Sequence, residues 1–219
     1  MTGTYIIGNW KSHMTRETAA EWFETFARQY VPEDGKTVIL CPPLLLVPFA
    51  RKQIEKFGLQ MSLGVQDMTP FADGAHTGEE PAELVKEYAS YALIGHSERR
   101  REFGETNELV ANKVAQAVKH DIMPVVCVQN GAVPVPEGAK LIAYEPLFAI
   151  GSGTPDTPEN ADGVAKKLSE SYNNAAIIYG GSVTDKNVRS FTERTYLKGV
   201  LPGGASLNPV TFAGIIRNA

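Results

Sequence analysis

The sequence predicts an α/β protein folded as one shortened (β/α)8 barrel that spans residues 1–219. Short runs of β-branched residues alternate with longer amphipathic stretches along the whole chain, and this alternation favours parallel strands joined by right-handed crossovers. Eight strands are expected, which is the number at which a parallel sheet closes into a barrel filled by side chains. No linker or low-complexity tract divides the chain, so we expect a single domain.

The predicted strands and helices follow one another in a regular order. We expect strands at residues 4–8, 37–41, 61–66, 91–94, 123–128, 141–144, 176–179 and 198–201, and helices at residues 15–29, 48–57, 81–88, 107–120, 158–172, 185–195 and 208–218. The helices are indicated by apolar residues at helical spacing, such as Ala19, Trp22 and Phe26 in the first of them. Asn208, followed by Pro209, is typical of a capped helix start.

One crossover helix is missing from this pattern. Only residues 129–140 separate the fifth and sixth strands, and Gly131 and Pro134 are among the helix breakers in this stretch. We therefore expect the fifth helix to be lost or reduced to a loop, which fits a chain shorter than the roughly 250 residues usual for such barrels. Part of the barrel wall is then left uncovered by the missing helix, and either Val133 and Val135 or a second contact would cover it.

A doubly wound open sheet is the alternative architecture. It would need a glycine-rich nucleotide-binding fingerprint after an early strand, and residues 8–11, Gly-Asn-Trp-Lys, do not form one. The barrel is therefore the preferred prediction.

Composition excludes several classes of partner. The net charge of −4 and the isoelectric point near 5.6 argue against binding to nucleic acid or to an anionic membrane. The sequence shows neither a signal peptide nor an apolar run of about 18 residues, the length that could span a bilayer. Cys41 and Cys127 each end an apolar run and are interpreted as buried thiols, which favours a reducing, cytoplasmic location.

Chemically capable side chains follow several of the predicted strands. In a parallel barrel the C-terminal strand ends meet on one face, where such barrels place their chemistry. The side chains delivered there are Asn9, Lys11, His96, Glu98 and Glu145. Each has a structural alternative, such as a solvated lysine, a hydrogen-bonded core histidine or an ion pair between Glu98 and Arg99, with Glu105 as a further partner for Arg99 or Arg100. Their convergence on one rim is more specific than any single residue.

Glycines and a hydroxyl residue complete this rim. Ser182 follows Gly181 after the seventh strand, and Gly203 and Gly204 follow the eighth. Backbone N–H groups in these two loops are the usual phosphate-binding site of the fold, although glycine pairs also serve plain tight turns. Gly151 would add a further donor from residues 146–153, a segment too apolar for a resting surface loop and suited to close over a ligand.

The combination predicts a class of reaction. His96 opens a short helix, whose positive end favours a neutral imidazole that can donate to a carbonyl oxygen. Glu145 supplies a carboxylate base beside the phosphate-binding loops, which fits proton abstraction next to a carbonyl. No second histidine or cysteine lies at zinc-ligand spacing, so no metal is expected.

Taken together, these segments resemble those of the triosephosphate isomerase family. The segments that carry the resemblance are Asn9-Trp10-Lys11, Gly95-His96-Ser97-Glu98-Arg99-Arg100, Tyr144-Glu145-Pro146, Ala149-Ile150-Gly151-Ser152-Gly153, Tyr179-Gly180-Gly181-Ser182-Val183 and Gly203-Gly204-Ala205-Ser206-Leu207. They occur in family order along nearly the whole chain. The resemblance implies a TIM barrel that interconverts dihydroxyacetone phosphate and D-glyceraldehyde 3-phosphate in glycolysis and gluconeogenesis, with no cofactor or metal.

The resemblance also implies roles for individual residues. Glu145 would be the base, His96 the neutral electrophile, and Glu98 the residue that orients this network. Lys11 and Asn9 would hold the substrate and stabilise the enediolate. The phosphate would be bound through the backbone of Gly151, Ser182, Gly203 and Gly204, beneath a lid that carries Phe148 and Ile150. The loop at residues 73–79 resembles the segment that inserts into a partner subunit near Lys11, which implies a homodimer.

Some positions depart from the family pattern. Besides the missing helix, Phe148 replaces the usual tryptophan, Thr154 replaces a common lysine, and Pro202 precedes the last glycine pair. Two other functions therefore stay open: an isomerase of another small sugar phosphate, and a non-catalytic phosphate-binding relic of the family. Intact Glu145, His96 and Lys11 argue against the relic.

Overall fold

The structure, a computed structural model that describes residues 3–151 and 153–219, is a closed barrel of parallel strands. Within the described residues eight strands pair in sequence order, and β1 pairs with β8 to close the sheet. They are β1 (Thr4–Asn9), β2 (Lys36–Cys41), β3 (Ser62–Val65), β4 (Tyr91–Ile94), β5 (Met123–Val128), β6 (Leu141–Tyr144), β7 (Ala176–Tyr179) and β8 (Leu197–Val200). The predicted (β/α)8 barrel is confirmed.

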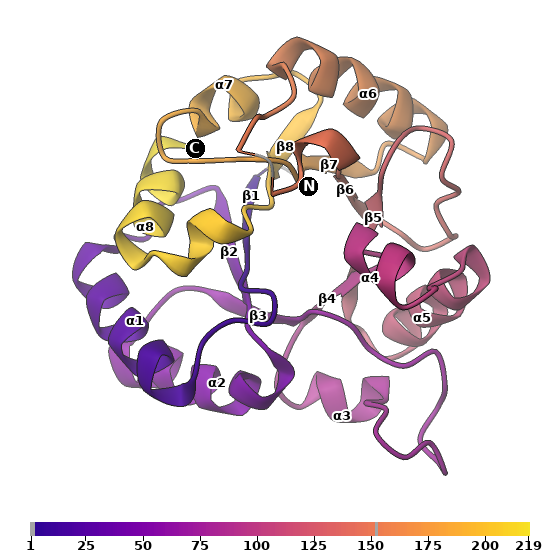
Figure 1. Cartoon of the computed structure of the whole chain (residues 1–219), viewed down its shortest axis with the longest axis horizontal. Coiled ribbons are helices and arrows are strands. Elements are labelled where there is room, and N and C mark those ends of the chain that lie inside the picture. The colour runs from indigo at the N-terminus through magenta and orange to yellow at the C-terminus, as the bar shows by residue number, and fades with distance from the viewer. Residues whose placement is uncertain (1–2, 152) are drawn as a thin grey trace.

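Helices form a ring around the barrel (Figure 1). They are α1 (Arg16–Gln29), α2 (Val47–Phe57), α3 (Ala82–Lys86), α4 (Ser97–Glu102), α5 (Asn107–Lys119), α6 (Pro158–Ser171), α7 (Val188–Thr192) and α8 (Pro209–Asn218), with short 3-10 turns η1 (Leu44–Leu46), η2 (Leu147–Ala149) and η3 (Gly204–Leu207). Thr15 accepts the Thr18 N–H before α1, and Asn208, the predicted cap, accepts two N–H groups at the start of α8. The caps explain where these helices begin.

Two predicted helices are shorter than expected. The helix predicted at residues 185–195 is confined to α7, because Thr184 donates its N–H to the Asn187 side chain and forms a turn before the helix. Such local side-chain bonds compete with helix formation. The helix predicted at residues 81–88 is reduced to α3.

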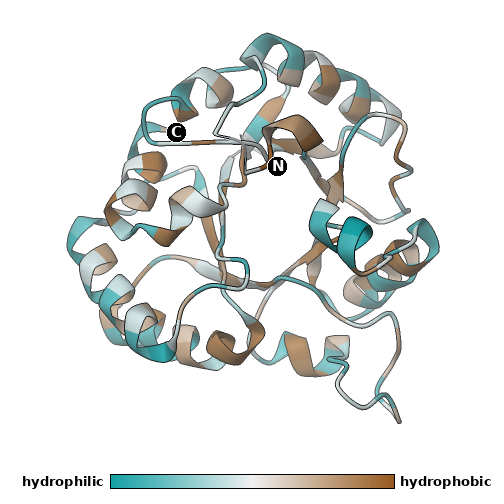
Figure 2. Ribbon diagram, viewed as in Figure 1, coloured by the Kyte–Doolittle hydropathy of each residue, from teal (hydrophilic) through white to brown (hydrophobic). Residues whose placement is uncertain are grey.

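Apolar side chains pack in two layers that follow the alternation along each strand. One set, including Ile7, Ile39 and Leu93, fills the inside of the barrel. The other lies between the strands and the helices and includes Phe23 and Phe26 of α1. Figure 2 shows the hydrophobic residues gathered on the strands and on the helix faces turned toward them. This packing holds the strand ends, and hence the side chains that follow them, in fixed positions.

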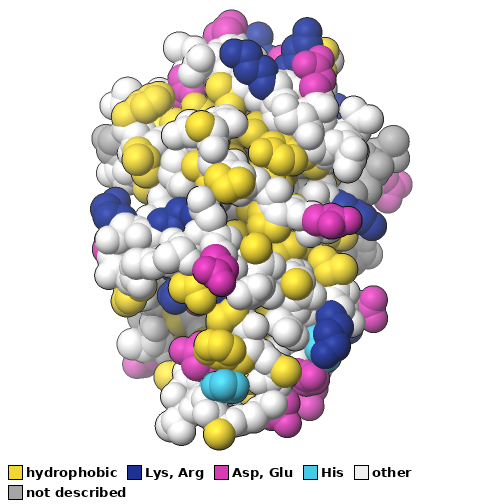
Figure 3. Space-filling view, turned by 90° about the vertical axis from the view of Figure 1, so that its right-hand side faces the viewer, with side chains coloured by type: hydrophobic (Ala, Val, Ile, Leu, Met, Phe, Trp, Pro, Cys, Tyr) yellow, Lys and Arg dark blue, Asp and Glu magenta, His cyan; other side chains and the backbone are white. Residues whose placement is uncertain are grey.

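The crossover between β5 and β6 has no helix, as predicted. Residues 129–140, all of which the structure describes, form turns and extended chain. The expected bare wall is not found, because the outward side chains Val126 and Ile142 are fully buried. Val133 and Val135 pack against the core and cover the wall in place of the helix. Figure 3 shows apolar side chains gathered on this side of the molecule.

Candidate active site

A cavity of about 270 Å³ opens at the C-terminal ends of the strands. The residues that line it are Asn9, Lys11, His96, Ile150, Gly151, Gly153, Gly180, Gly181, Ser182, Val183, Thr184, Leu201, Gly203, Gly204 and Ala205. The sequence prediction that these loops meet is therefore correct. Glu98 lies in an adjoining hollow that shares Asn9, Lys11 and His96. Glu145 lies behind His96, completely buried.

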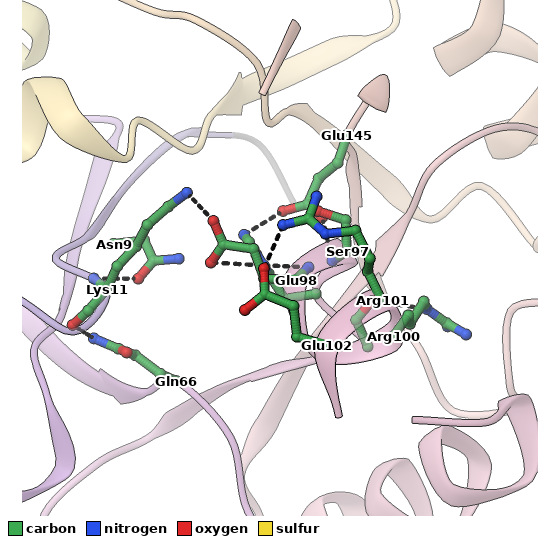
Figure 4. A network of polar contacts seen from close by, with 11 residues as sticks. Asn9, Lys11, Gln66, Ser97, Glu98, Arg100, Arg101, Glu102 and Glu145 are labelled. Atoms are coloured by element: carbon green, nitrogen blue, oxygen red, sulfur yellow. Dashed lines mark hydrogen bonds and ion pairs between the residues drawn. The ribbon is translucent and has the colours of Figure 1, made fainter. Parts of the chain in front are cut away.

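Lys11 is held in an unusual backbone conformation at the end of β1. Its φ of 52° falls in the left-handed region, which is uncommon for a residue with a side chain. Its N–H donates to Asn9 Oδ1 at 2.9 Å, and its carbonyl accepts from Gln66 Nε2 at 2.9 Å. Figure 4 shows both contacts. The role of Gln66 could not be predicted, because nothing in the sequence of the loop after β3 indicates which backbone group its amide would reach.

The ammonium of Lys11 pairs with Glu98. Lys11 Nζ lies 2.5 Å from Glu98 Oε1 (Figure 4), and both side chains line the hollow that adjoins the cavity. Burial by itself raises the pKa of Glu98, but the hydrogen bond from Lys11 and the nearby His96 and Arg101 outweigh it and hold this pKa below its ordinary value. The alternative pairing of Glu98 with Arg99 is wrong, since Arg99 contacts other acids.

His96 caps α4, and this fixes its ring. Nδ1 accepts the N–H of Glu98 at 3.2 Å. A neutral ring in this position therefore carries its hydrogen on Nε2. Nε2 lies 3.1 Å from Glu145 Oε1, although among the described residues no donor is aligned on that oxygen. The imidazole thus faces both the cavity and the candidate base.

Glu145 rests against the start of α4. Its Oε2 accepts the N–H of Ser97 at 3.1 Å. A side chain at Gly180 would not fit beside it, because a Cβ there would lie 2.8 Å from Glu145 Cγ. To enter the cavity, the carboxylate has to rotate away from Ser97. This resting contact could not be predicted from the sequence either, because it depends on a side-chain rotamer.

Hydrogen bonds from β1 and α1 anchor the glycine loop that follows β8. Asn9 donates its N–H to Pro202 O at 3.0 Å, so the proline that departs from the family pattern is held by its carbonyl. The carbonyl of Ser206 accepts both indole N–H groups of Trp10 and Trp22, at 3.2 and 3.1 Å. These bonds fix η3, whose first residue Gly204 lines the cavity together with the preceding Gly203.

The apolar segment after Glu145 covers one edge of the cavity. Leu147 and Phe148 are 60% and 61% exposed, which is unusual for large apolar side chains at rest. Ala149 O accepts from Ser182 Oγ at 2.8 Å, so the segment touches a phosphate-loop residue. Gly151 has a φ of 66°, a backbone conformation that favours glycine. Ser152, which belongs to the same segment, lies outside the described residues.

A buried cluster of charges supports α4 from behind. Lys113 Nζ pairs with Asp67 Oδ1 at 2.7 Å and with Glu105. Arg99 Nε lies 2.7 Å from Asp67 Oδ2 and 3.5 Å from Glu105 Oε1, so Glu105 is a partner of Arg99, as predicted. Arg100 instead contacts Asn107 and the Gly95 carbonyl. The cluster joins α4, the helix that carries Glu98 and is capped by His96, to α5 and to the loop after β3.

The described residues, 3–151 and 153–219, contain neither a cluster of metal ligands nor a membrane-spanning helix. Among them no group of three or more histidine, cysteine, aspartate or glutamate side chains is placed to hold a metal ion. Within the same part of the chain, no helix combines the length and apolar character needed to cross a membrane.

Comparison with known proteins identifies the family. The family model described as triosephosphate isomerase matches residues 4–139 and 132–219. The chain is 35% identical to the triosephosphate isomerase of Shewanella loihica, with 96% of this chain and 95% of that protein covered. It is also 35% identical to that of Thermus thermophilus over the full length of both, and 34% identical to that of Mesomycoplasma hyorhinis, with 99% and 98% covered. The chain belongs to the triosephosphate isomerase family.

Proposed function

We propose that this protein interconverts dihydroxyacetone phosphate and D-glyceraldehyde 3-phosphate, as a step of glycolysis and gluconeogenesis. The observation that carries the proposal is the single cavity that joins Lys11, His96 and Asn9 to the backbone of the two glycine loops, with Glu145 3.1 Å behind His96. A three-carbon substrate with its phosphate on the loops would place its carbonyl carbon and the adjacent reacting carbon between these side chains. Neither a cofactor nor a metal is required for this chemistry.

The proposed reaction is a proton transfer between adjacent carbons. Glu145 rotates from Ser97 into the cavity, removes a proton from one carbon and returns it to the next, so that the carboxylate is regenerated. His96 donates from Nε2 to the carbonyl oxygen on which negative charge develops and takes up the proton that the neighbouring hydroxyl releases, while Lys11 and Asn9 stabilise the same enediolate. Glu98 keeps Lys11 in place, since the two groups are 2.5 Å apart.

The phosphate would be bound by backbone N–H groups of Gly151, Ser182, Gly203 and Gly204. Such donors match the charge of a phosphate without adding a titratable group. Residues 146–153 would then act as a lid. Closure of the apolar side chains expels water, strengthens the dipoles that act on the enediolate and protects it from losing phosphate.

A coupled isomerase assay tests this proposal. We expect the wild type to turn over both triose phosphates, and Glu145→Asp and His96→Gln each to lower turnover by about two to four orders of magnitude. Glu24→Asp is the matched control, because Glu24 is exposed on α1. Equal activity in the three variants would overturn the proposed roles.

The same assay separates the two other functions. Binding of a phosphate analogue by a wild type that does not isomerise either triose phosphate would indicate the non-catalytic relic. Efficient turnover of a different sugar phosphate, with poor turnover of glyceraldehyde 3-phosphate, would indicate the other isomerase. Either result would replace the function proposed above.

We propose further that two copies of the chain form a homodimer through residues 73–79. This loop projects from the barrel between β3 and α3 (Figure 1), and its His76 stacks on Phe71 with ring centroids 4.4 Å apart. The hollow beside Lys11 is bordered by Phe103, which is 69% exposed. The exposed aromatic ring at this hollow could therefore pack against the loop of a second copy. Sedimentation velocity tests this: the wild type should sediment as a dimer, and a variant with residues 74–78 removed as a monomer. A monomeric wild type would contradict the proposal.

The proposed location is the cytoplasm. Glycolytic chemistry and two free, buried cysteines support a reducing compartment. Fractionation of the source cells with an antibody to this chain would test the assignment.

A further inference from the structure

Arg100 holds the two peptide groups on either side of His96. Its Nε donates to the carbonyl of Gly95 at 2.8 Å, and its own backbone N–H donates to the carbonyl of His96 at 3.1 Å. The first carbonyl belongs to the peptide group that precedes His96, and the second belongs to the one that follows it. One residue of α4 therefore fixes the backbone of the histidine from both ends.

The peptide group before His96 needs such a partner. Gly95 joins β4 to His96 with a φ of 77°, in the left-handed region that favours glycine, and glycine restricts its own backbone less than any other residue. A side chain would not fit here, because a Cβ on Gly95 would lie 2.9 Å from Arg100 Nη2 and 3.1 Å from Val110 Cγ2. The guanidinium thus supplies from outside the restraint that the glycine itself lacks.

The guanidinium of Arg100 is anchored in turn. Its Nη1 donates to Asn107 Oδ1 at 2.7 Å, and Asn107 is the first residue of α5. The neighbouring arginines face other partners: Arg99 Nε lies 2.7 Å from Asp67 Oδ2, and Arg101 pairs with an acid of its own helix. Among the bonds of the described residues, Arg100 is therefore the one of these three arginines whose side chain contacts a peptide group of His96.

The orientation of His96 matters because of what its ring does. Nδ1 accepts the N–H of Glu98 at 3.2 Å, which leaves Nε2 as the donor toward the cavity. A turn of the preceding peptide group would swing the ring away from this bond and move Nε2 off the substrate oxygen. Donors stabilise developing charge only when they are aimed in advance, so a small misplacement lowers the rate strongly.

We propose that Arg100 is a positioning residue for the reaction, because its clamp on the two peptide groups of His96 aims the imidazole at the substrate. This inference rests on the proposed function, in which His96 donates to the oxygen that becomes negative. Arg100 is not among the residues that line the cavity, so it acts through His96 and not on the substrate.

Steady-state kinetics give the first test. Arg100→Met keeps the aliphatic stem but removes every side-chain donor, and we expect it to lower kcat about tenfold while KM changes by less than about twofold. The split arises because the phosphate stays on the glycine loops, whereas His96 stabilises charge that develops only in the transition state. Arg100→Lys keeps one charged donor without the planar fork and should recover part of kcat. Asn107→Ala releases only Nη1 and should lower kcat about threefold.

Nitrogen-15 NMR of labelled imidazoles reports on the clamp without substrate. The chain has four histidines, and the signals of His96 are those that disappear in His96→Gln. At mildly alkaline pH the wild type should show a protonated Nε2 and an unprotonated Nδ1, with chemical shifts far apart. In Arg100→Met the ring should move between orientations and tautomers, which would bring the two shifts closer together.

Arg194→Met is the matched control. Arg194 also donates from Nε to a backbone carbonyl, that of Ser190 at 3.0 Å, and it pairs with Glu159. These contacts lie at α7 and α6, on other elements than those that hold His96. The thermal midpoint should fall in both methionine variants, while kcat and the His96 signals should change only in Arg100→Met.

The outcomes separate the inference from the proposed function. A folded Arg100→Met with the kcat and His96 shifts of the wild type would overturn the inference, as would an equal loss of kcat in Arg194→Met. If Arg100→Met does not fold, Asn107→Ala with both values unchanged would overturn it instead. A wild type that does not isomerise triose phosphates would remove the proposed function, whereas the NMR comparison would still decide whether Arg100 fixes the ring.

Discussion

The buried charge cluster behind α4 gives the sharpest stability prediction. Lys113 and Glu105 are 5% and 6% exposed, and both Asp67 and Glu105 depend on Lys113 for neutralisation. Lys113→Met keeps the length of the side chain but leaves the buried carboxylate of Glu105 and the partly buried carboxylate of Asp67 with only Arg99 nearby. Removing one partner of a buried ion pair costs about 3–5 kcal/mol. Because Arg99 lies 2.7 Å from Asp67, we expect a loss near the lower end, about 3 kcal/mol.

The loss should also depend on pH. Burial raises the pKa of Asp67 even in the presence of Lys113 and Arg99. Without Lys113 this pKa rises further, so the folded state of the variant binds more protons than the unfolded state. Its free energy of unfolding therefore falls as the pH rises through the interval between the two pKa values. Lys113→Met should lose more stability at pH 8 than at pH 5.

Urea unfolding followed by circular dichroism measures both effects. Glu105→Gln added to Lys113→Met removes one of the stranded charges and should restore at least about 1 kcal/mol. Lys119→Met is the control, since Lys119 is exposed on the same helix and should change stability by at most about 0.5 kcal/mol. A loss below about 1 kcal/mol for Lys113→Met, or a loss independent of pH, would refute the reasoning.

Three further predictions follow from individual contacts. Gly181→Ala places a Cβ 2.1 Å from the Tyr179 hydroxyl and should lower the free energy of unfolding by about 1–3 kcal/mol. Gly204→Ala is its control, because no described atom lies within 4 Å of the new Cβ, and it should leave the free energy of unfolding nearly unchanged. The pKa of Glu98 is lowered in the folded state, so its carboxylate stabilises the fold at neutral pH, and this contribution is lost as the pH falls below about 4, the ordinary carboxyl range. Glu98→Gln should therefore melt at a lower temperature than the wild type at neutral pH, and the difference should disappear in acid. A difference in melting temperature that does not change with pH would contradict this prediction. Burial raises the pKa of both cysteine thiols, so iodoacetamide should label them only after denaturation, and rapid labelling of the native protein would show that they are accessible.

Much of the fold could be predicted because local patterns and global topology agree. The alternation of apolar residues located all eight strands of the described chain, and the parallel arrangement brought Asn9, Lys11 and His96 to one rim without knowledge of any contact. The absence of a helix between β5 and β6 was also predictable, because glycine and proline exclude helices locally. Covering of the wall by Val133 and Val135 was only one of two options, since packing depends on the whole fold.

The contacts that tune the site could not be predicted. Gln66 and Lys11 are 55 residues apart, and Lys113 and Asp67 are 46 residues apart; no periodicity relates such positions. The resting contact between Glu145 and Ser97 depends on a rotamer, which is chosen by the surrounding packing. The hydrogen bonds and ion pairs between residues far apart in the sequence are therefore the part of the site that only the structure reveals.

Proton transfer by Glu145 is the central claim, and isotope exchange tests it most directly. The wild type would convert dihydroxyacetone phosphate in deuterium oxide, and the glyceraldehyde 3-phosphate formed would be analysed by mass spectrometry. A carboxylate that exchanges its proton with solvent predicts product with deuterium at carbon 2, and loss of both product and label in Glu145→Gln. Product formed at the wild-type rate without deuterium would show a direct hydride shift and contradict the mechanism.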